Sequence, residues 1–152
     1  MTSSFDPTAF LDATTTEAAT ARPPLPVGDY VATITDIEFK SGISAKTGNP
    51  WNKAEMILSL EIPGEVRELL GLSTPNLTLR DGVMLDTTAQ NTLDWAPGKN
   101  RGLRNYRVAT DNNEAGKPFA LSMLKGQIVR VKIGHEAYED RLLERVNGVT
   151  KF

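Results

Sequence analysis

The sequence contains no cysteine, a single histidine and no long apolar run. The lack of cysteine excludes disulfides, thiolate nucleophiles, thiolate zinc sites and iron–sulfur clusters. No apolar segment approaches the roughly 18 residues that a membrane span requires. The N-terminus has neither a basic start nor an apolar stretch, so we expect no secretory signal. These absences predict a cytoplasmic protein that is not attached to a membrane.

The residues that most enzymes use are also scarce. The only imidazole, His135, stands next to Glu136 in an expected turn, which is typical of a surface histidine. Gly98-Lys99 resembles a phosphate loop only faintly, because Leu93 and Asn100 occupy the positions of the first glycine and of the magnesium ligand. Three dispersed aspartates match no calcium loop: Asp81, Asp86 and Asp94. We therefore expect no catalytic activity, no metal and no cofactor.

Charge is distributed unevenly along the chain, although the net charge is only −2. Residues 1–98 carry 6 Lys/Arg and 13 Asp/Glu, a balance of −7. Residues 99–152 carry 11 Lys/Arg and 6 Asp/Glu, a balance of +5. This asymmetry indicates either a face that binds a polyanion or solvated charge on two halves of one surface.

Residues 1–26 form a separate N-terminal arm, rich in Thr, Ala and Ser, and the proline-rich stretch 23–26 ends it as a linker. Asp6 is expected to cap one short helix, with Pro7 at its first position and Phe5 packed on Phe10. So short a helix is marginal alone. It either frays or docks Phe5, Phe10 and Leu11 on the domain or on a neighbouring subunit, which would make a homo-oligomer.

Residues 27–152 form one domain with the pattern of β-strands. Tyr30, Ala32 and Ile34 alternate on one face, and the phase then slips to Ile37 and Phe39, which predicts a β-bulge. A second strand alternates over residues 54–62. A third spans 76–86, interrupted at 81–82. Residues 65–72 and 102–110 are expected to be short helices. The chain closes with a hairpin whose turn spans 134–140.

Five short strands with little helix predict a mainly β fold, a five-stranded barrel of the oligonucleotide/oligosaccharide-binding (OB) type. One or two short helices and the extended arm complete it. Four aromatic side chains are assigned to its core: Tyr30, Phe39, Trp95 and Tyr106.

A barrel of this type binds single-stranded nucleic acid through cations that follow the phosphates and aromatic rings that stack on bases. Both inter-strand loops that would flank such a surface contain an aromatic residue beside a cation. The candidate binding residues are Lys46, Trp51, Lys53, Arg80, Arg101, Arg104, Arg130, Lys132, Tyr138 and Arg141.

Other interpretations of these residues remain open. Trp51 follows Pro50 and has an equal claim to capping one end of the barrel. Basic residues on outward strand faces are commonly just solvated. Glu55 and Glu61 lie on the outward face of the second strand and would repel phosphate from a groove there.

An ordered series of short segments resembles small bacteriophage single-stranded-DNA-binding proteins, a family often catalogued as a phage domain of unknown function. The segments begin with Leu25-Pro26-Val27-Gly28-Asp29-Tyr30 and Lys46-Thr47-Gly48-Asn49-Pro50. They continue with Met84-Leu85-Asp86, Pro97-Gly98-Lys99-Asn100-Arg101-Gly102-Leu103, Gly116-Lys117-Pro118-Phe119, Leu124-Lys125-Gly126-Gln127 and Val146-Asn147-Gly148-Val149. The resemblance covers residues 25–152 and implies an OB-type fold and a role in phage DNA replication or recombination. The sequence ends Val149-Thr150-Lys151-Phe152 instead of in the acidic tail of many single-strand binders, so tail-mediated recruitment is not expected.

Two functions follow from these patterns. The first is non-catalytic, largely sequence-independent binding of single-stranded DNA in the cytoplasm of a host cell. The alternative is a phage structural or assembly protein whose barrel is a scaffold and whose arm latches onto a neighbouring subunit.

Overall fold

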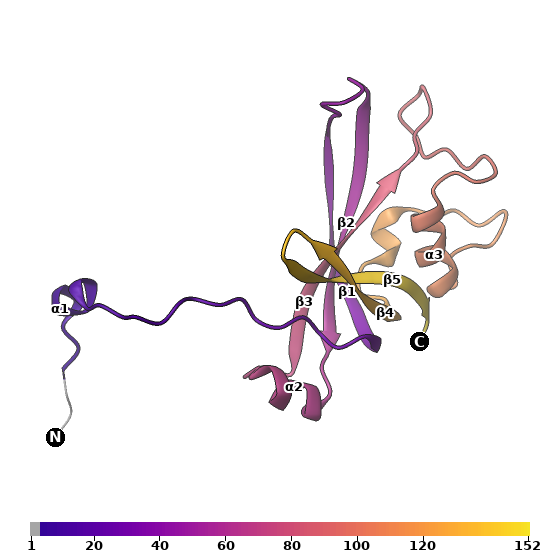
Figure 1. The fold of residues 1–152 in the computed structure, drawn as a ribbon. Coiled ribbons are helices and arrows are strands. Elements are labelled where there is room, and N and C mark those ends of the chain that lie inside the picture. Colours follow the sequence, from indigo (N-terminus) through magenta and orange to yellow (C-terminus); the bar gives the residue numbers. More distant parts are fainter. Residues whose placement is uncertain (1–3) are drawn as a thin grey trace.

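The fold was obtained as a computed structural model that describes residues 4–152 (Figure 1). Five strands follow one another along the chain: β1 (Gly28–Ile43), β2 (Pro50–Glu61), β3 (Asn76–Leu85), β4 (Ile128–Tyr138) and β5 (Arg141–Lys151). Four short helices accompany them: α1 (Pro7–Asp12), α2 (Gly64–Leu70), α3 (Arg101–Ala109) and the 3-10 helix η1 (Leu121–Leu124). The prediction of a mainly β fold with few short helices is confirmed.

The strands form one antiparallel sheet in the order β3-β2-β1-β4-β5. Strands β3 and β5 are its edges and are not paired with each other, so the predicted closed barrel is not confirmed. Helix α3 packs against both edge strands and covers the space between them. The sheet is therefore open, with a helix where closure would occur.

Strand β1 serves both halves of the sheet. Its first residues pair with β4 and its later residues with β2, and the register shifts between Ile34 and Asp36. The predicted bulge is confirmed at this point. The side chain of Asp36 accepts the backbone N–H of Ile37 at 2.9 Å, and the hydroxyl of Thr35 donates to the carbonyl of Ile57 at 3.1 Å. These bonds satisfy groups that the interrupted ladder leaves free.

The core lies between the concave face of the sheet and α3. Strand β2 alternates strictly, with Ala54, Met56, Leu58 and Leu60 fully buried. Leu103, Tyr106 and Ala109 form the buried face of α3. Removing this apolar area from water is the main source of stability.

One polar contact joins α3 to β3 inside this core. The hydroxyl of Tyr106 donates to the carboxylate of Asp81 at 2.6 Å. Burial raises the pKa of Asp81 above its ordinary value, and burial likewise raises the pKa of Tyr106. The bond satisfies both groups where water is excluded.

Several local predictions are wrong. Strand β3 continues through Asp81 and Gly82, because both residues pair with β2. Strand β4 runs to Tyr138, so the turn contains only Glu139 and Asp140. His135 therefore lies in a strand, where the ladder to β5 outweighs the turn tendency of its neighbours.

Two of the four aromatic residues assigned to the core are exposed. Phe39 is 63% exposed, because β1 extends past the body of the sheet into a long hairpin with β2. Trp95 is 42% exposed and stacks on a cation in a loop instead of packing in the core. Tyr30 and Tyr106 are buried as predicted.

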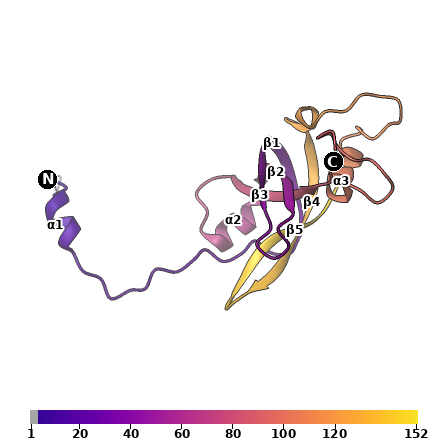
Figure 2. The ribbon, with the colours of Figure 1, turned by 90° about the horizontal axis from the view of Figure 1, so that it is seen from above.

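The N-terminal arm projects away from the sheet (Figures 1 and 2). Every residue from Ser4 to Pro23 is exposed. The side chain of Asp6 caps α1 by accepting the N–H groups of Thr8 and Ala9, and the rings of Phe5 and Phe10 lie 5.2 Å apart. The predicted cap and aromatic pair are confirmed. Along residues 4–152, no helix is both long enough and apolar enough to cross a membrane.

Candidate nucleic-acid interface

The convex face of the sheet carries the side chains that alternate with the core residues. On β2 this face presents Trp51 and Lys53. The indole of Trp51 lies over the backbone of Gly42, its partner on β1: a Cβ at Gly42 would meet the ring at 2.5 Å. The ammonium of Lys53 lies 5.8 Å from the indole centroid. Glycine thus lets the half-buried ring lie over the backbone of the strand, beside a cation.

Arg80 of β3 faces the same side but is already paired. Its guanidinium lies 2.7 Å from the carboxylate of Glu38 and 3.6 Å from that of Glu55. Lys40 of β1 approaches the other oxygen of Glu55 at 2.6 Å. This contact with Lys40 holds the pKa of Glu55 below its ordinary value, and the charges of Arg80 and Lys53 act in the same direction.

At the centre of this face, the carboxylates of Glu38 and Glu55 neutralise the cations of Lys40 and Arg80. Glu55 is one of the two outward carboxylates that the sequence analysis expects to repel phosphate. It forms ion pairs with Lys40 and Arg80, two cations that could otherwise contact a polyanion. Glu61 lies at the far end of β2, next to α2 and away from Trp51.

A second basic group lies on β4. Arg130 and Lys132 are exposed on the convex face, opposite Val129, Val131 and Ile133 in the core. Neither makes an ion pair within residues 4–152. The guanidinium of Arg130 lies 6.0 Å from the ring centroid of Phe152, which is 63% exposed.

The tips of two hairpins hold three further candidates. Lys46 lies in the loop between β1 and β2, and it is exposed. Tyr138 and Arg141 are direct partners at the end of the β4–β5 ladder, and Tyr138 is 55% exposed. Tyr138 is the last residue of β4 and Arg141 the first of β5, so neither lies within the wider loop that the sequence predicts.

Arg101 and Arg104 occupy a different part of the molecule. Both are exposed on α3, which covers the space between the two edge strands. Arg107, the third arginine of α3, is half-buried. Its guanidinium lies 4.5 Å from the centroid of Trp95 and 4.3 Å from that of Phe119, which ties two loops to α3.

The structure thus brings the candidates together in pairs. Trp51 lies with Lys53, Arg130 with Lys132, and Tyr138 with Arg141, whereas Arg80 is held by carboxylates and Arg101 and Arg104 lie on α3. Sequence reasoning missed Lys40 and Phe152. The alternation of β1 beyond its bulge could have identified Lys40, because Phe39 and Lys40 must face opposite sides. Nothing local identifies Phe152, because it follows the end of β5.

Within the described part of the chain, no three metal-binding side chains gather at one place. Neither a protein-family model nor a curated protein matches the sequence. The arrangement of charge and aromatic surface is therefore the basis for a functional assignment.

Proposed function

We propose that this protein binds single-stranded DNA without catalysis and with little sequence preference, as a bacteriophage replication or recombination protein. The observation that carries the proposal is the pairing of Trp51 with Lys53 on the convex face, on the same side of the sheet as the unpaired cations Arg130 and Lys132. An aromatic ring that stacks on any base, next to cations that follow phosphate, is the arrangement of sequence-tolerant single-strand binders.

The connectivity of the sheet supports an OB-like assignment. Joining β3 to β5 would close the sheet into a five-stranded barrel, with α3 lying between β3 and β4 in sequence and at the joint in space. Partly open barrels of this type bind oligonucleotides on the face of their second and third strands, between the first and last hairpin loops. Trp51, Lys53 and Arg80 occupy that face, and Lys46 and Arg141 occupy those hairpins.

The direct test is titration of the protein into a fluorescent oligo-dT at several salt concentrations, with duplex DNA as the control. Each phosphate neutralised on a single strand contributes a slope of about −0.7 to log affinity against log salt. Lys46, Lys53, Arg130 and Lys132, if all engaged, predict a slope of about −3. A flat salt response, or equal affinity for duplex DNA, would contradict the proposal.

Removing the central carboxylate should strengthen binding. In Glu55→Gln, Lys40 loses the carboxylate that now holds it and becomes available to phosphate, whereas Arg80 keeps its 2.7 Å contact with Glu38. We expect tighter binding of oligo-dT and a salt slope steeper by about 0.7 for each cation that engages. Fluorescence anisotropy at several salt concentrations measures both quantities.

The matched control for this variant is Glu68→Gln, which removes one exposed carboxylate from α2. It changes the net charge by the same amount without touching the convex face. If both variants strengthen binding equally, only net charge matters, and the DNA does not pass over Glu55.

A further inference from the structure

The N-terminal arm carries an apolar surface that its own domain does not cover. Phe5 is 71% exposed, Phe10 65% and Leu11 82%. A helix of six residues is not stable alone in water, yet α1 has a complete side-chain cap and an aromatic pair at its start. Local contacts therefore determine the conformation of the segment. Phe5, Phe10 and Leu11 gain no hydrophobic stabilisation from the domain, because the described part of the chain does not bury them.

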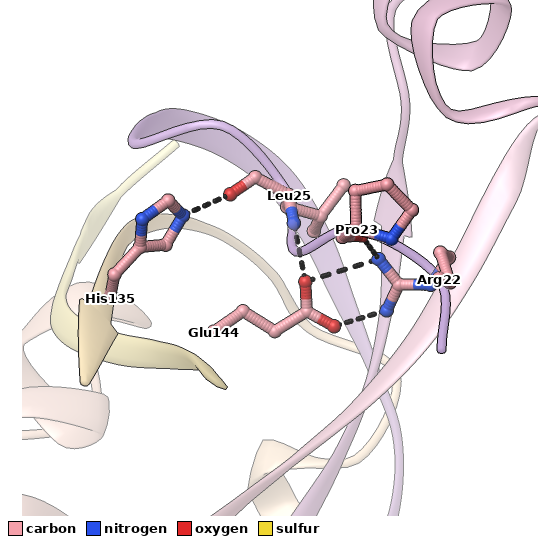
Figure 3. A network of polar contacts seen from close by, with 5 residues as sticks. All are labelled: Arg22, Pro23, Leu25, His135 and Glu144. Atoms are coloured by element: carbon pink, nitrogen blue, oxygen red, sulfur yellow. Dashed lines mark hydrogen bonds and ion pairs between the residues drawn. The ribbon is translucent and has the colours of Figure 1, made fainter. Parts of the chain in front are cut away.

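The root of the arm is fixed to the β4–β5 hairpin (Figure 3). Glu144 of β5 accepts the backbone N–H of Leu25 at 2.6 Å and forms an ion pair with Arg22. His135 of β4 contacts the carbonyl of Leu25 at 2.6 Å, and the Leu25 side chain is fully buried. The arm therefore leaves the domain from a defined point, and only the residues before Arg22 are free to move to a partner.

A groove with a partly apolar lining lies between β1, β2, β3 and η1. Two pockets of about 330 and 300 Å³ meet at Phe39 and Leu121. Leu93 and Leu85 line the first pocket, and Ile37 lines the second. The exposed ring of Phe39 stands between them. Each pocket is large enough for an aromatic or leucine side chain.

The length of the arm disfavours docking in its own groove. The twelve residues from Leu11 to Arg22 reach at most about 40 Å when fully extended. Between Gly28 and Phe39, β1 alone spans about 36 Å at 3.3 Å per residue. The 86–100 loop and η1 form one wall of the groove. The arm leaves the sheet in the direction away from both of them (Figure 1). A cis path that followed β1 would therefore use most of the reach of the spacer.

We propose that α1 of one copy docks in the Phe39–Leu121 groove of a second copy, with Phe5, Phe10 and Leu11 filling its two pockets. The inference does not depend on DNA binding. Reciprocal exchange of arms makes a closed dimer, whereas one-way exchange makes a ring or an open chain of subunits. In either arrangement, the contacts of Arg22 and Leu25 with Glu144 and His135 fix the point and direction in which the arm leaves its own domain.

The absence of cysteine from the 152-residue chain allows a clean cross-linking test in that chain. Leu11→Cys and Ser122→Cys, the latter beside the second pocket, are prepared separately, one with an affinity tag, then mixed and oxidised. We expect a disulfide-linked pair containing one chain of each kind. Ser73→Cys, an exposed position after α2, replaces Ser122→Cys as the control and should yield much less.

Light scattering measures the same interaction without cross-linking. The unmodified protein should have a mass that is a multiple of the 16.6 kDa chain, and Phe10→Asp or Phe39→Asp should reduce it to one chain. Both positions are exposed, so the fold should tolerate the change. Leu69→Asp, which alters an exposed leucine of α2, should leave the mass unchanged.

Two results would overturn the proposal. One is a mass of 16.6 kDa for the unmodified protein at every concentration, with no mixed disulfide. The other is a disulfide that forms only within single chains when Leu11→Cys and Ser122→Cys are combined in one molecule, because the arm would then occupy its own groove.

Discussion

Trp51→Ala should weaken binding to oligo-dT by about 1–3 kcal/mol for a stacked base, or about 5- to 150-fold. The indole lies on the backbone of Gly42 and beside Lys53, so its position is set before any ligand arrives. A pre-positioned ring loses little conformational freedom on binding, and alanine cannot replace the stacking area. Fluorescence anisotropy of labelled oligo-dT measures the loss.

The second tryptophan provides the control for this prediction. Trp95 lies in a loop, stacks on Arg107 of α3 and is outside the proposed surface. The Trp95→Phe variant should therefore bind DNA as the unmodified protein does. That variant also leaves Trp51 as the only indole, whose fluorescence should be quenched when a base stacks on it. Unchanged affinity in Trp51→Ala together with no quenching would remove Trp51 from the interface.

Asn100→Ala should lower the free energy of unfolding by about 3 kcal/mol, the largest stability effect that we predict for a single polar side chain. Asn100 is 1% exposed. Its side-chain oxygen accepts the N–H of Asp86 at 2.9 Å, and its amide donates to the carbonyls of Asp86 and Asp94 at 2.9 and 2.7 Å. Alanine would leave these part-buried backbone groups without their partner. Urea unfolding measures the change.

The backbone of Asn100 adds to this cost. Its φ of +52° is in the left-handed region, which asparagine tolerates better than alanine. Asn100→Gly removes the hydrogen bonds but relieves the backbone, so it should be less destabilising than Asn100→Ala. Asn113→Ala, in an exposed loop, is the control. An Asn100→Ala cost no greater than that of Asn113→Ala would show that the side chain does not hold the 86–100 loop.

Local patterns predicted much of the fold because their signals involve residues that are close in sequence. The alternation around Tyr30, the phase slip before Ile37 and the cap at Asp6 all depend on a few neighbouring residues. Each expresses a preference of the backbone or of one amphipathic surface, which no distant contact reverses.

Predictions failed where a long-range partner decided the outcome. Pairing with β2 holds β3 straight through Asp81 and Gly82, and pairing with β5 carries β4 past His135. Phe39 has the spacing of a core residue, but the hairpin that contains it extends beyond the body of the sheet. Local composition contains no information about how far a neighbouring strand extends, so it overestimated the turns and the core.

By itself, the sequence determined the strand faces, the helices α1, α2 and α3, the separate arm and the residue types available for binding, because these depend on spacing and side-chain chemistry. Only the tertiary structure decided which of those residues act together. It places Trp51 beside Lys53, holds Arg80 between Glu38 and Glu55, and leaves β3 and β5 apart with α3 between them. These results follow from strand register and sheet curvature, which are set by contacts between residues far apart in the chain.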